Sequence, residues 1–465
     1  MKADNFMSNE GCPQEAGVEP RGNAGARSRA SVSKSGQCDS ERKGERLLEA
    51  IVSRENLNLA YKRVKGNGGS PGVDGMTTEE LLSYLKAHGA VLRQSLLNGD
   101  YVPRAVRRVE IPKPGGGTRQ LGIPTVTDRL IQQAIAQVLN NIFDKDFSAN
   151  SYGFRPGRSA HMAIQAARRH IEDGNRWVVD LDLEKFFDRV NHDKLMSLVA
   201  RKVGDKRVLR LVRKYLEAGV MLNGVKVKNA EGTPQGGPLS PLLANILLDE
   251  LDKELERRGH RFCRYADDCN IYVGSEKAGG RVMAGITRYI EDVLKLKVNR
   301  EKSAVDKPGK RKFLGLSFYT RKGKARNFVH PKSVERFREK VREITSRSNG
   351  RDMCWRREKL TRLINGWVDY FRIADMKENA RELDGWIRRR IRMCYWRQWK
   401  RIRTKHDRLL KLGLDDRKAW EYANSRKGCW CISGGVILNQ ALPTTRLTNL
   451  GFPSIGQRLS SAYQV

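Results

Sequence analysis

The sequence has no run of about eighteen apolar residues, the minimum that a helix needs to cross a bilayer. Its N-terminus also lacks the basic and then apolar pattern of a secretory signal. The sequence therefore predicts neither membrane insertion nor export, and we expect a cytoplasmic protein.

Cysteine pairs at zinc-ligand spacing are also missing. Among the eight cysteines only Cys429 and Cys431 stand close together, and without a nearby histidine they are a weak metal signal. We expect reduced structural thiols, as in a reducing cytoplasm.

Acidic residues are scarce relative to basic ones. The chain has 53 Asp and Glu against 89 Lys and Arg, which leaves a net charge of +36. Self-repulsion at this charge opposes a compact state unless a partner neutralises it. Nucleic acid is the expected partner, and a basic surface without any partner is the disfavoured alternative.

The length of 465 residues suggests about three domains. Residues 1–45 contain almost no large apolar side chains, so we expect a disordered leader. A folded region of mixed helix and strand is predicted over 46–325, followed by basic amphipathic helices over 326–420. Residues after about Gly428 show no clear period.

Alternating apolar and basic residues predict a hairpin over 101–125, with Lys113 and Arg119 near its tip. A helix from Leu130 to Phe143 follows, and Asp128 is its expected N-cap.

A short strand is predicted at 177–182, and a helix is expected to begin at Asp193. A second helix follows Gly237-Pro238, and a hairpin covers 261–273. Long helices begin at Pro331 and should pack as a bundle. The fold class is therefore α+β with a helical C-terminal part.

Asp267 and Asp268 are adjacent carboxylates at the predicted turn between apolar strands, where they would repel each other without a cation. Asp182 adds a third carboxylate at a strand end. Three such groups suit two Mg²⁺ ions that hold a triphosphate, which indicates nucleotidyl transfer. An Asp-Asp pair alone is more often a solvated turn, so the inference depends on the ordered set of motifs.

That ordered set resembles the motif order of reverse transcriptases. It consists of Asp182, Phe187, Gln235-Gly236, Tyr265-Ala266-Asp267-Asp268 and Lys302. Two longer strings resemble the reverse transcriptases of bacterial group II introns in particular: Tyr152-Gly153-Phe154-Arg155-Pro156-Gly157-Arg158-Ser159 and Gly232-Thr233-Pro234-Gln235-Gly236-Gly237-Pro238-Leu239-Ser240-Pro241. The resemblance covers about residues 46 to 400 and includes Gly72-Val73-Asp74-Gly75 and Phe313-Leu314-Gly315.

The resemblance implies a right-hand polymerase with fingers and palm at 46–325 and an α-helical thumb and maturase domain, domain X, at 326–420. It implies an RNA-directed DNA polymerase and maturase that binds intron RNA, assists splicing and reverse transcribes the intron during retrohoming. The expected partners are intron RNA, a DNA target and primer, and dNTPs. On DNA the protein would associate with the nucleoid.

The resemblance also implies the metal ligands, namely Asp182, Asp267 and Asp268 with the carbonyl of Leu183. Asp180 is the second choice, because it should point the same way as Asp182 along a strand.

Other roles are implied around the nucleotide. Phe187 resembles the residue that excludes a ribose 2′-hydroxyl, and neighbouring Phe186 should be core if the segment is extended. Lys113 and Arg119 resemble the residues that hold the triphosphate. Gln235 and Gly236 resemble the motif that contacts nucleotide and template, and Lys302 resembles the residue proposed to protonate pyrophosphate.

Basic residues interleaved with aromatic ones predict nucleic-acid contacts. The candidates are Arg155, Arg158, Arg356, Arg357, Arg362, Arg388, Arg389, Arg397 and Lys400. Aromatic residues at helical spacing are expected to be core by default.

No Cys-x-x-Cys pair or His-Asn-His pattern follows the basic helices, so no DNA-cutting domain is expected. Residues 421–465 are either a DNA-contacting extension or a tail packed on the bundle. Two other functions stay open: a domesticated reverse transcriptase in defence or repair, and a catalytically silent splicing factor. The sequence does not decide whether the chain forms a homodimer.

Overall fold

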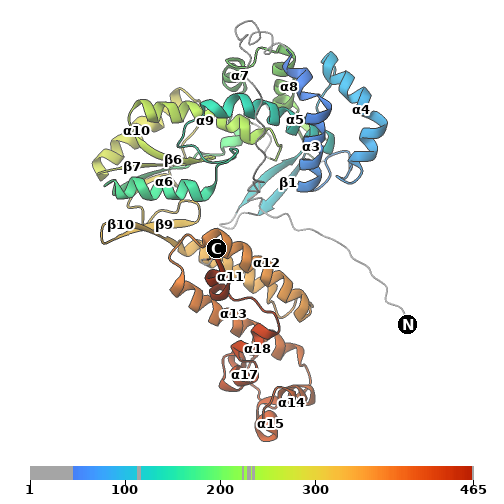
Figure 1. Cartoon of the computed structure of the whole chain (residues 1–465), viewed down its shortest axis with the longest axis vertical. Helices are drawn as coiled ribbons and strands as arrows, with labels where there is room; N and C mark the ends of the chain where they lie inside the picture. The colour runs from blue at the N-terminus through green and yellow to red at the C-terminus, as the bar shows by residue number, and fades with distance from the viewer. Residues whose placement is uncertain (1–45, 113–116, 223–224, 228–231, 233–235, 463–465) are drawn as a thin grey trace, which may run out of the picture. The chain divides into compact units, whose positions relative to one another are not determined.

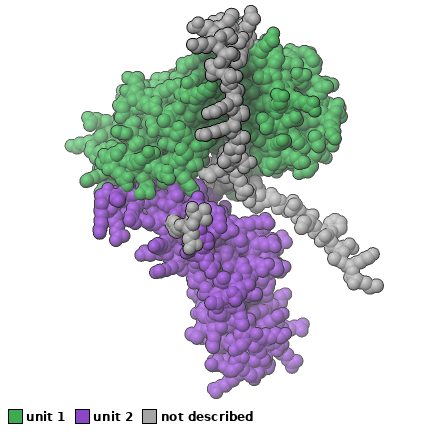
Figure 2. Space-filling view, in the orientation of Figure 1, with its two compact units in different colours: residues 1–307 green, residues 308–465 purple. Residues whose placement is uncertain are grey.

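The computed structural model of the chain describes residues 46–112, 117–222, 225–227, 232 and 236–462. The chain divides into two compact units, residues 1–307 and 308–465 (Figure 2). The leader predicted at 1–45, Lys113 and Gln235 lie outside the described residues.

The elements of the first unit are shown in Figure 1. Its helices are α2 (Leu47–Ile51), α3 (Arg54–Asn67), α4 (Leu81–Asn98), α5 (Val126–Phe143), α6 (Ala160–Glu172), α7 (His192–Ala200), α8 (Lys206–Glu217), α9 (Ser240–Arg257) and α10 (Glu276–Asp292), with 3₁₀ turns η1 (Asp144–Asp146) and η2 (Phe186–Asp188). Its strands are β1 (Val106–Pro112), β2 (Thr118–Ile123), β3 (Trp177–Leu181), β4 (Val220–Leu222), β5 (Val225–Val227), β6 (Arg261–Tyr265), β7 (Asp268–Val273) and β8 (Ala304–Asp306).

One sheet of the first unit has the order β2-β1-β4-β5. Strands β1 and β2 pair antiparallel from Arg107 opposite Ile123 to Pro112 opposite Thr118, which confirms the hairpin predicted over 101–125. Strand β4 runs parallel to β1, so a segment more than a hundred residues downstream continues the sheet of this hairpin.

The second sheet has the order β6-β7-β3-β8, and each neighbouring pair is antiparallel. Helix α6 covers one face, where the ring of His170 lies beside Tyr272. Helices α9 and α10 cover the other face, and Gly279 of α10 lies against side chains of β3, β7 and β8. Strands β3, β6 and β7 are therefore mostly buried, whereas the edge strand β8 is half-buried.

Helix α9 confirms the apolar period predicted after Gly237-Pro238. Leu243, Leu247 and Leu251 are almost completely buried in the core of this unit. Full burial of a leucine stabilises a fold by about 1.5–3 kcal/mol, so this face holds α9 in the core of the first unit.

Two predicted helix starts were wrong by a few residues. Helix α5 is capped by Thr125, whose side chain accepts from the backbone N–H of Asp128. Asp128 lies inside the helix, where it accepts hydrogen bonds from Thr125 Oγ1 and from the hydroxyl of Tyr101. Helix α7 begins at His192 instead of Asp193, because Asn191 provides the cap.

The second unit contains a hairpin of β9 (Leu316–Arg321) and β10 (Lys324–Val329) followed by helices. The long helices are α11 (Pro331–Ile344), α12 (Met353–Phe371) and α13 (Lys377–Gln398), and the shorter ones are α14 (Ile402–Lys411), α15 (Asp416–Ala423), α16 (Cys429–Ser433), α17 (Val436–Ala441), α18 (Thr444–Asn449) and α19 (Ile455–Ala462). Leu360, Ile364 and Ile387 are buried between the long helices, as the period predicted.

Helices α16 and α19 both pack on α13, so residues after 428 join the bundle. Across the described parts of the chain, no helix combines the length and hydropathy needed to span a membrane.

Candidate active site

The predicted carboxylates converge at one end of the sheet that contains β3. Asp268 begins β7 and Asp267 lies in the turn that joins β6 to β7. Asp182 follows Leu181, the residue that pairs with Cys269, so Asp182 and Asp268 face each other one residue beyond this pair. Sequence segments more than eighty residues apart therefore bring three aspartates to the same sheet end.

Asp182 is fixed by the loop that precedes β8. Its backbone N–H donates to Ser303 Oγ at 3.0 Å, and its carbonyl accepts from the N–H of Asn299 at 2.8 Å. The same loop places Lys302 Nζ 3.5 Å from Asp182 Oδ2. Because the Asp182 side chain is 32% exposed, a ligand can reach it from solvent.

Asp180 occupies a different environment from Asp182. It pairs with Asn270 on β7 and with Ala304 on β8, so its backbone lies within the sheet. Asp182 lies beyond the last paired residue of β3. The structure therefore places Asp182, and not Asp180, at the end of the strand next to the turn.

The donor set fits Mg²⁺, because the three aspartates offer only hard oxygen ligands. Among the described residues no three His, Cys, Asp or Glu side chains form a ready-made metal cluster. Mg²⁺ is commonly held by one or two carboxylates together with substrate phosphates and water, and not by an all-protein cage. The arrangement of Asp182, Asp267 and Asp268 suits that mode of binding.

The two adjacent phenylalanines differ in burial. Phe186 is 3% exposed and belongs to the core, whereas Phe187 is half-buried and packs against the core from outside. Their rings meet edge to face at 5.1 Å. The segment is not extended, because η2 turns here after Lys185 adopts a φ of 47°. One of the pair is nevertheless core, as predicted.

Gly236 lies against strand β2. Its φ is +117°, and a Cβ there would stand 2.6 Å from the carbonyl oxygen of Gly122. Only glycine tolerates both the backbone conformation and this close approach. Arg119 is on the same strand, opposite Ile111, so the hairpin and the Gly236 segment are neighbours.

The burial of Arg155 corrects the prediction that this residue contacts nucleic acid. It is 7% exposed, and its guanidinium donates to Asp144 Oδ1 at 2.7 Å and to the carbonyl of Ser151 at 3.0 Å. The Arg155 guanidinium therefore binds groups within the protein and fixes the loop before α6. Arg158 is half-buried, donates to the carbonyl of Ala149 and lies over the ring of Tyr152.

The prediction that Arg356 contacts nucleic acid is corrected in the same way. Arg356 is 4% exposed and donates hydrogen bonds to Ser346 O and Asn349 Oδ1. Arg357 and Arg389 bind the carbonyls of Leu450 and Trp430, and Arg389 also lies 4.0 Å from the Trp430 ring centre.

The other predicted basic residues of the second unit keep their solvent contact. Arg388 is half-buried, and Arg362, Arg397 and Lys400 are exposed. Trp396 and Trp399 are buried, as expected for aromatic residues at helical spacing.

Free thiols were also expected, and Cys263, Cys269, Cys354, Cys394, Cys429 and Cys431 are free. Burial raises the pKa of the Cys263 thiol to about 12, so this thiol next to the turn is neutral at physiological pH. Neutral buried thiols add no charge beside the aspartates.

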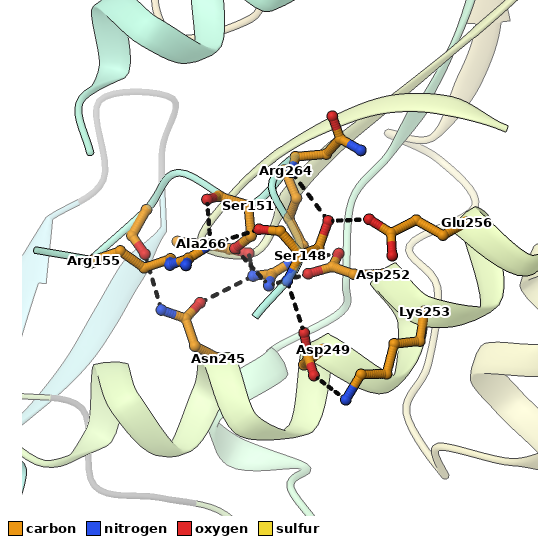
Figure 3. Close-up of polar contacts among 12 residues, drawn as sticks. Ser148, Ser151, Arg155, Asn245, Asp249, Asp252, Lys253, Glu256, Arg264 and Ala266 are labelled. Atoms are coloured by element: carbon orange, nitrogen blue, oxygen red, sulfur yellow. Dashed lines mark hydrogen bonds and ion pairs between the residues drawn. The ribbon is translucent and has the colours of Figure 1, made fainter. Parts of the chain in front are cut away.

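Sequence reasoning missed a buried polar network under the turn (Figure 3). It centres on Arg264 and includes Asn245, Asp252 and Ser151. A signal was present, because the polar residues Asn245, Asp249 and Asp252 recur at helical spacing and are all buried on α9. Arg264 likewise occupies an inward position of a strand.

Comparisons with known proteins show which families the chain resembles. Residues 111–318 match the family model described as reverse transcriptase (RNA-dependent DNA polymerase), and residues 334–413 match the maturase-specific domain of group II introns. Protein YkfC of Escherichia coli (strain K12) is 35% identical over 301 residues, which cover 56% of this chain and 79% of that protein.

The group II intron-encoded protein LtrA of Lactococcus lactis subsp. cremoris is 38% identical over 223 residues, which cover 48% of this chain and 37% of LtrA. Among solved structures, a partial Cas6-RT-Cas1–Cas2 complex has a chain that is 25% identical, with a TM-score of 0.35 and coverage of 53% of this chain and 42% of that chain.

Proposed function

The chain belongs to the family of group II intron reverse transcriptases and maturases, and from this premise we propose that it binds intron RNA, assists splicing and reverse transcribes the intron during retrohoming. Its catalytic class is RNA-directed DNA polymerase. The proposed substrates are dNTPs, a DNA target and a primer, and the proposed chemistry is two-metal nucleotidyl transfer.

The observation that supports this proposal most directly is the meeting of three carboxylates with Lys302 at one sheet end, namely those of Asp182, Asp267 and Asp268. Three carboxylates and a cation in one place suit a polyanionic substrate held through Mg²⁺. A protein that only binds RNA gains nothing from clustered carboxylates, because they repel phosphate.

The aspartates Asp182, Asp267 and Asp268 would hold Mg²⁺, which when bound favours ionisation of the primer hydroxyl and neutralises phosphate charge. Lys302, whose Nζ lies 3.5 Å from Asp182 Oδ2, would donate a proton to the leaving pyrophosphate. The Phe187 ring would stand against the sugar and exclude a 2′-hydroxyl.

The remaining nucleotide contacts come from the hairpin and from the segment beside it. Gly236 allows close backbone approach beside β2, and Gln235 precedes it with both a donor and an acceptor. Arg119 and Lys113 would bind the triphosphate.

Binding of intron RNA is proposed for the second unit. Its exposed Arg362, Arg397 and Lys400 can reach phosphates, whereas Arg356 cannot because it is buried. Residues 334–413, which match the maturase-specific domain, contain all four residues.

The proposal is tested by primer extension on an RNA template with dNTPs and Mg²⁺. We compare the wild-type chain with Asp267→Ala/Asp268→Ala and with Asp292→Ala, an exposed aspartate at the end of α10. Extension by wild type and Asp292→Ala but not by the double variant is expected.

The same proteins are assayed for binding and splicing of intron RNA. No extension by wild type, with intron RNA still bound and spliced, would point to a catalytically silent splicing factor. Extension without any preference for intron RNA would point to a domesticated reverse transcriptase in defence or repair.

A further inference from the structure

The turn that carries Asp267 has a disfavoured backbone. Ala266 has a φ of +56°, in the left-handed region that residues with a Cβ rarely adopt. Its backbone also meets Gly153, where an added Cβ would stand 2.3 Å from Ala266 N. Such a conformation persists only when surrounding groups hold it.

Arg264, a residue of β6 whose side chain points to α9, supplies one of these groups (Figure 3). Its Nη1 donates to the carbonyl of Ala266 at 2.9 Å and to Asn245 Oδ1 at 3.0 Å. Its Nη2 and Nε bind the Asp252 carboxylate at 2.5 and 2.7 Å, and Nη2 also donates to Ser151 Oγ. All five N–H donors of the guanidinium therefore have acceptors.

The Arg264–Asp252 pair is unusually deep. The two side chains are 1% and 0% exposed. A charge buried this far is tolerated only with a close partner and satisfied hydrogen bonds. The planar fork of arginine satisfies these acceptors together, which the single ammonium of lysine cannot do.

The same groups connect the turn to the segment before α6. Asn245 Nδ2 donates to the carbonyl of Gly153 at 2.9 Å, and Tyr152 N donates to the carbonyl of Arg264 at 2.9 Å. Helix α9 and the Tyr152-Gly153 segment thus hold the turn from two directions.

We propose that Arg264 is a positioning residue that sets the geometry of the Asp267–Asp268 turn through its hydrogen bond to the Ala266 carbonyl. It has no contact with substrate and acts through the backbone of the turn. This inference rests on the proposed function, because it assigns the turn a role in holding Mg²⁺.

The test compares Arg264→Lys with Arg207→Lys, a matched control in the same unit. Arg207 also binds carboxylates with its fork, those of Glu49 in α2 and of Asp205, the N-cap of α8. Mn²⁺ binding is titrated by electron paramagnetic resonance in the presence of primer–template and a non-extendable dNTP. Primer extension then gives kcat and KM.

For Arg264→Lys we expect Mn²⁺ affinity and kcat to fall by about 10- to 100-fold, which is the usual effect of changing a residue that orients a metal ligand without binding the metal itself. The Kd for primer–template should stay within about twofold, because phosphate contacts are untouched. Arg207→Lys should leave both Mn²⁺ affinity and kcat near wild type.

Wild-type Mn²⁺ affinity and kcat in Arg264→Lys would overturn the inference. If that variant does not fold, Asn245→Ala replaces it, since it keeps the Arg264–Asp252 pair and removes one bond to Arg264 and one to Gly153. Its Mn²⁺ affinity must then fall, or the inference is rejected. Absence of extension by wild type would reject the proposed function instead, and the Mn²⁺ titration would still decide this inference.

Discussion

At the scale of single residues, the difference in burial between Phe186 and Phe187 predicts two different consequences of losing a ring. Phe187→Ala should open space beside the sugar and raise incorporation of ribonucleotides relative to dNTPs by about 10- to 100-fold, the range that one pocket contact can supply. The measurement is kcat/KM for rNTP and dNTP on one primer–template.

Phe186→Ala is the comparison for this prediction. It removes a core ring and should lower the free energy of unfolding by about 3–5 kcal/mol without changing sugar selectivity. Unchanged selectivity in Phe187→Ala would remove Phe187 as the steric gate.

The sequence contained enough information to bring the main site residues together. The strand end after Leu181 and the turn at Asp267 are both visible as short apolar runs that end in carboxylates, and the structure places them at one sheet end. Burial of charged side chains was not visible in this way. Arg155 and Arg356 are predicted to contact nucleic acid, yet both are enclosed by carbonyl groups of the loops that directly precede them.

At the scale of elements, Asp205 connects two helices of the first unit. It caps α8 by accepting from the N–H of Arg207, and it accepts from the N–H of Leu48 in α2 at 3.1 Å. Burial raises the pKa of its carboxyl, but the hydrogen bonds from Arg207 and Leu48 outweigh this effect, so the pKa lies below its ordinary value of 3.8.

Asp205→Asn should therefore lower the free energy of unfolding by about 1 kcal/mol at neutral pH, since Arg207 is partly exposed and solvent screens the pair. A lowered pKa means that the carboxylate stabilises the fold above its ordinary pKa and loses this effect as pH falls further. Urea denaturation of both proteins from pH 7 to about pH 3 should show the difference shrinking. A constant difference would contradict the assignment.

Long periodic elements were predictable, and short ones were not. The hairpins at 106–123 and 261–273 and helices α9 and α12 follow from apolar spacing over many residues. Helices α16 to α19 have five to eight residues each, so a helical period is repeated too few times to be recognised in the sequence. Strand β8 has three residues and exists because β3 offers an edge to pair with.

At the scale of the whole molecule, the net charge of +36 predicts strong salt dependence of RNA binding. With about six phosphate contacts, affinity for intron RNA should fall by about 10³-fold between 50 and 200 mM salt. Changing Arg362, Arg397 and Lys400 together to Gln should reduce the slope of log Kd against log salt concentration by about 2 to 3. Fluorescence anisotropy of labelled intron RNA measures both quantities.

Arg356→Gln is the contrasting variant. Because Arg356 is buried, its loss should lower the temperature of unfolding and leave the salt slope unchanged. A slope reduced equally by both variants would mean that exposure does not identify the phosphate contacts.

The loop that fixes Asp182 also sets the timing of catalytic competence during synthesis. Ser303, which binds the backbone of Asp182, is translated 121 residues later. At 5–20 residues per second a ribosome needs about 6 to 24 s to cover that interval. Asp182 is therefore synthesised long before Ser303, the residue that orients it. Polymerase activity can arise only after β8, the last strand of this sheet in chain order, has paired with β3.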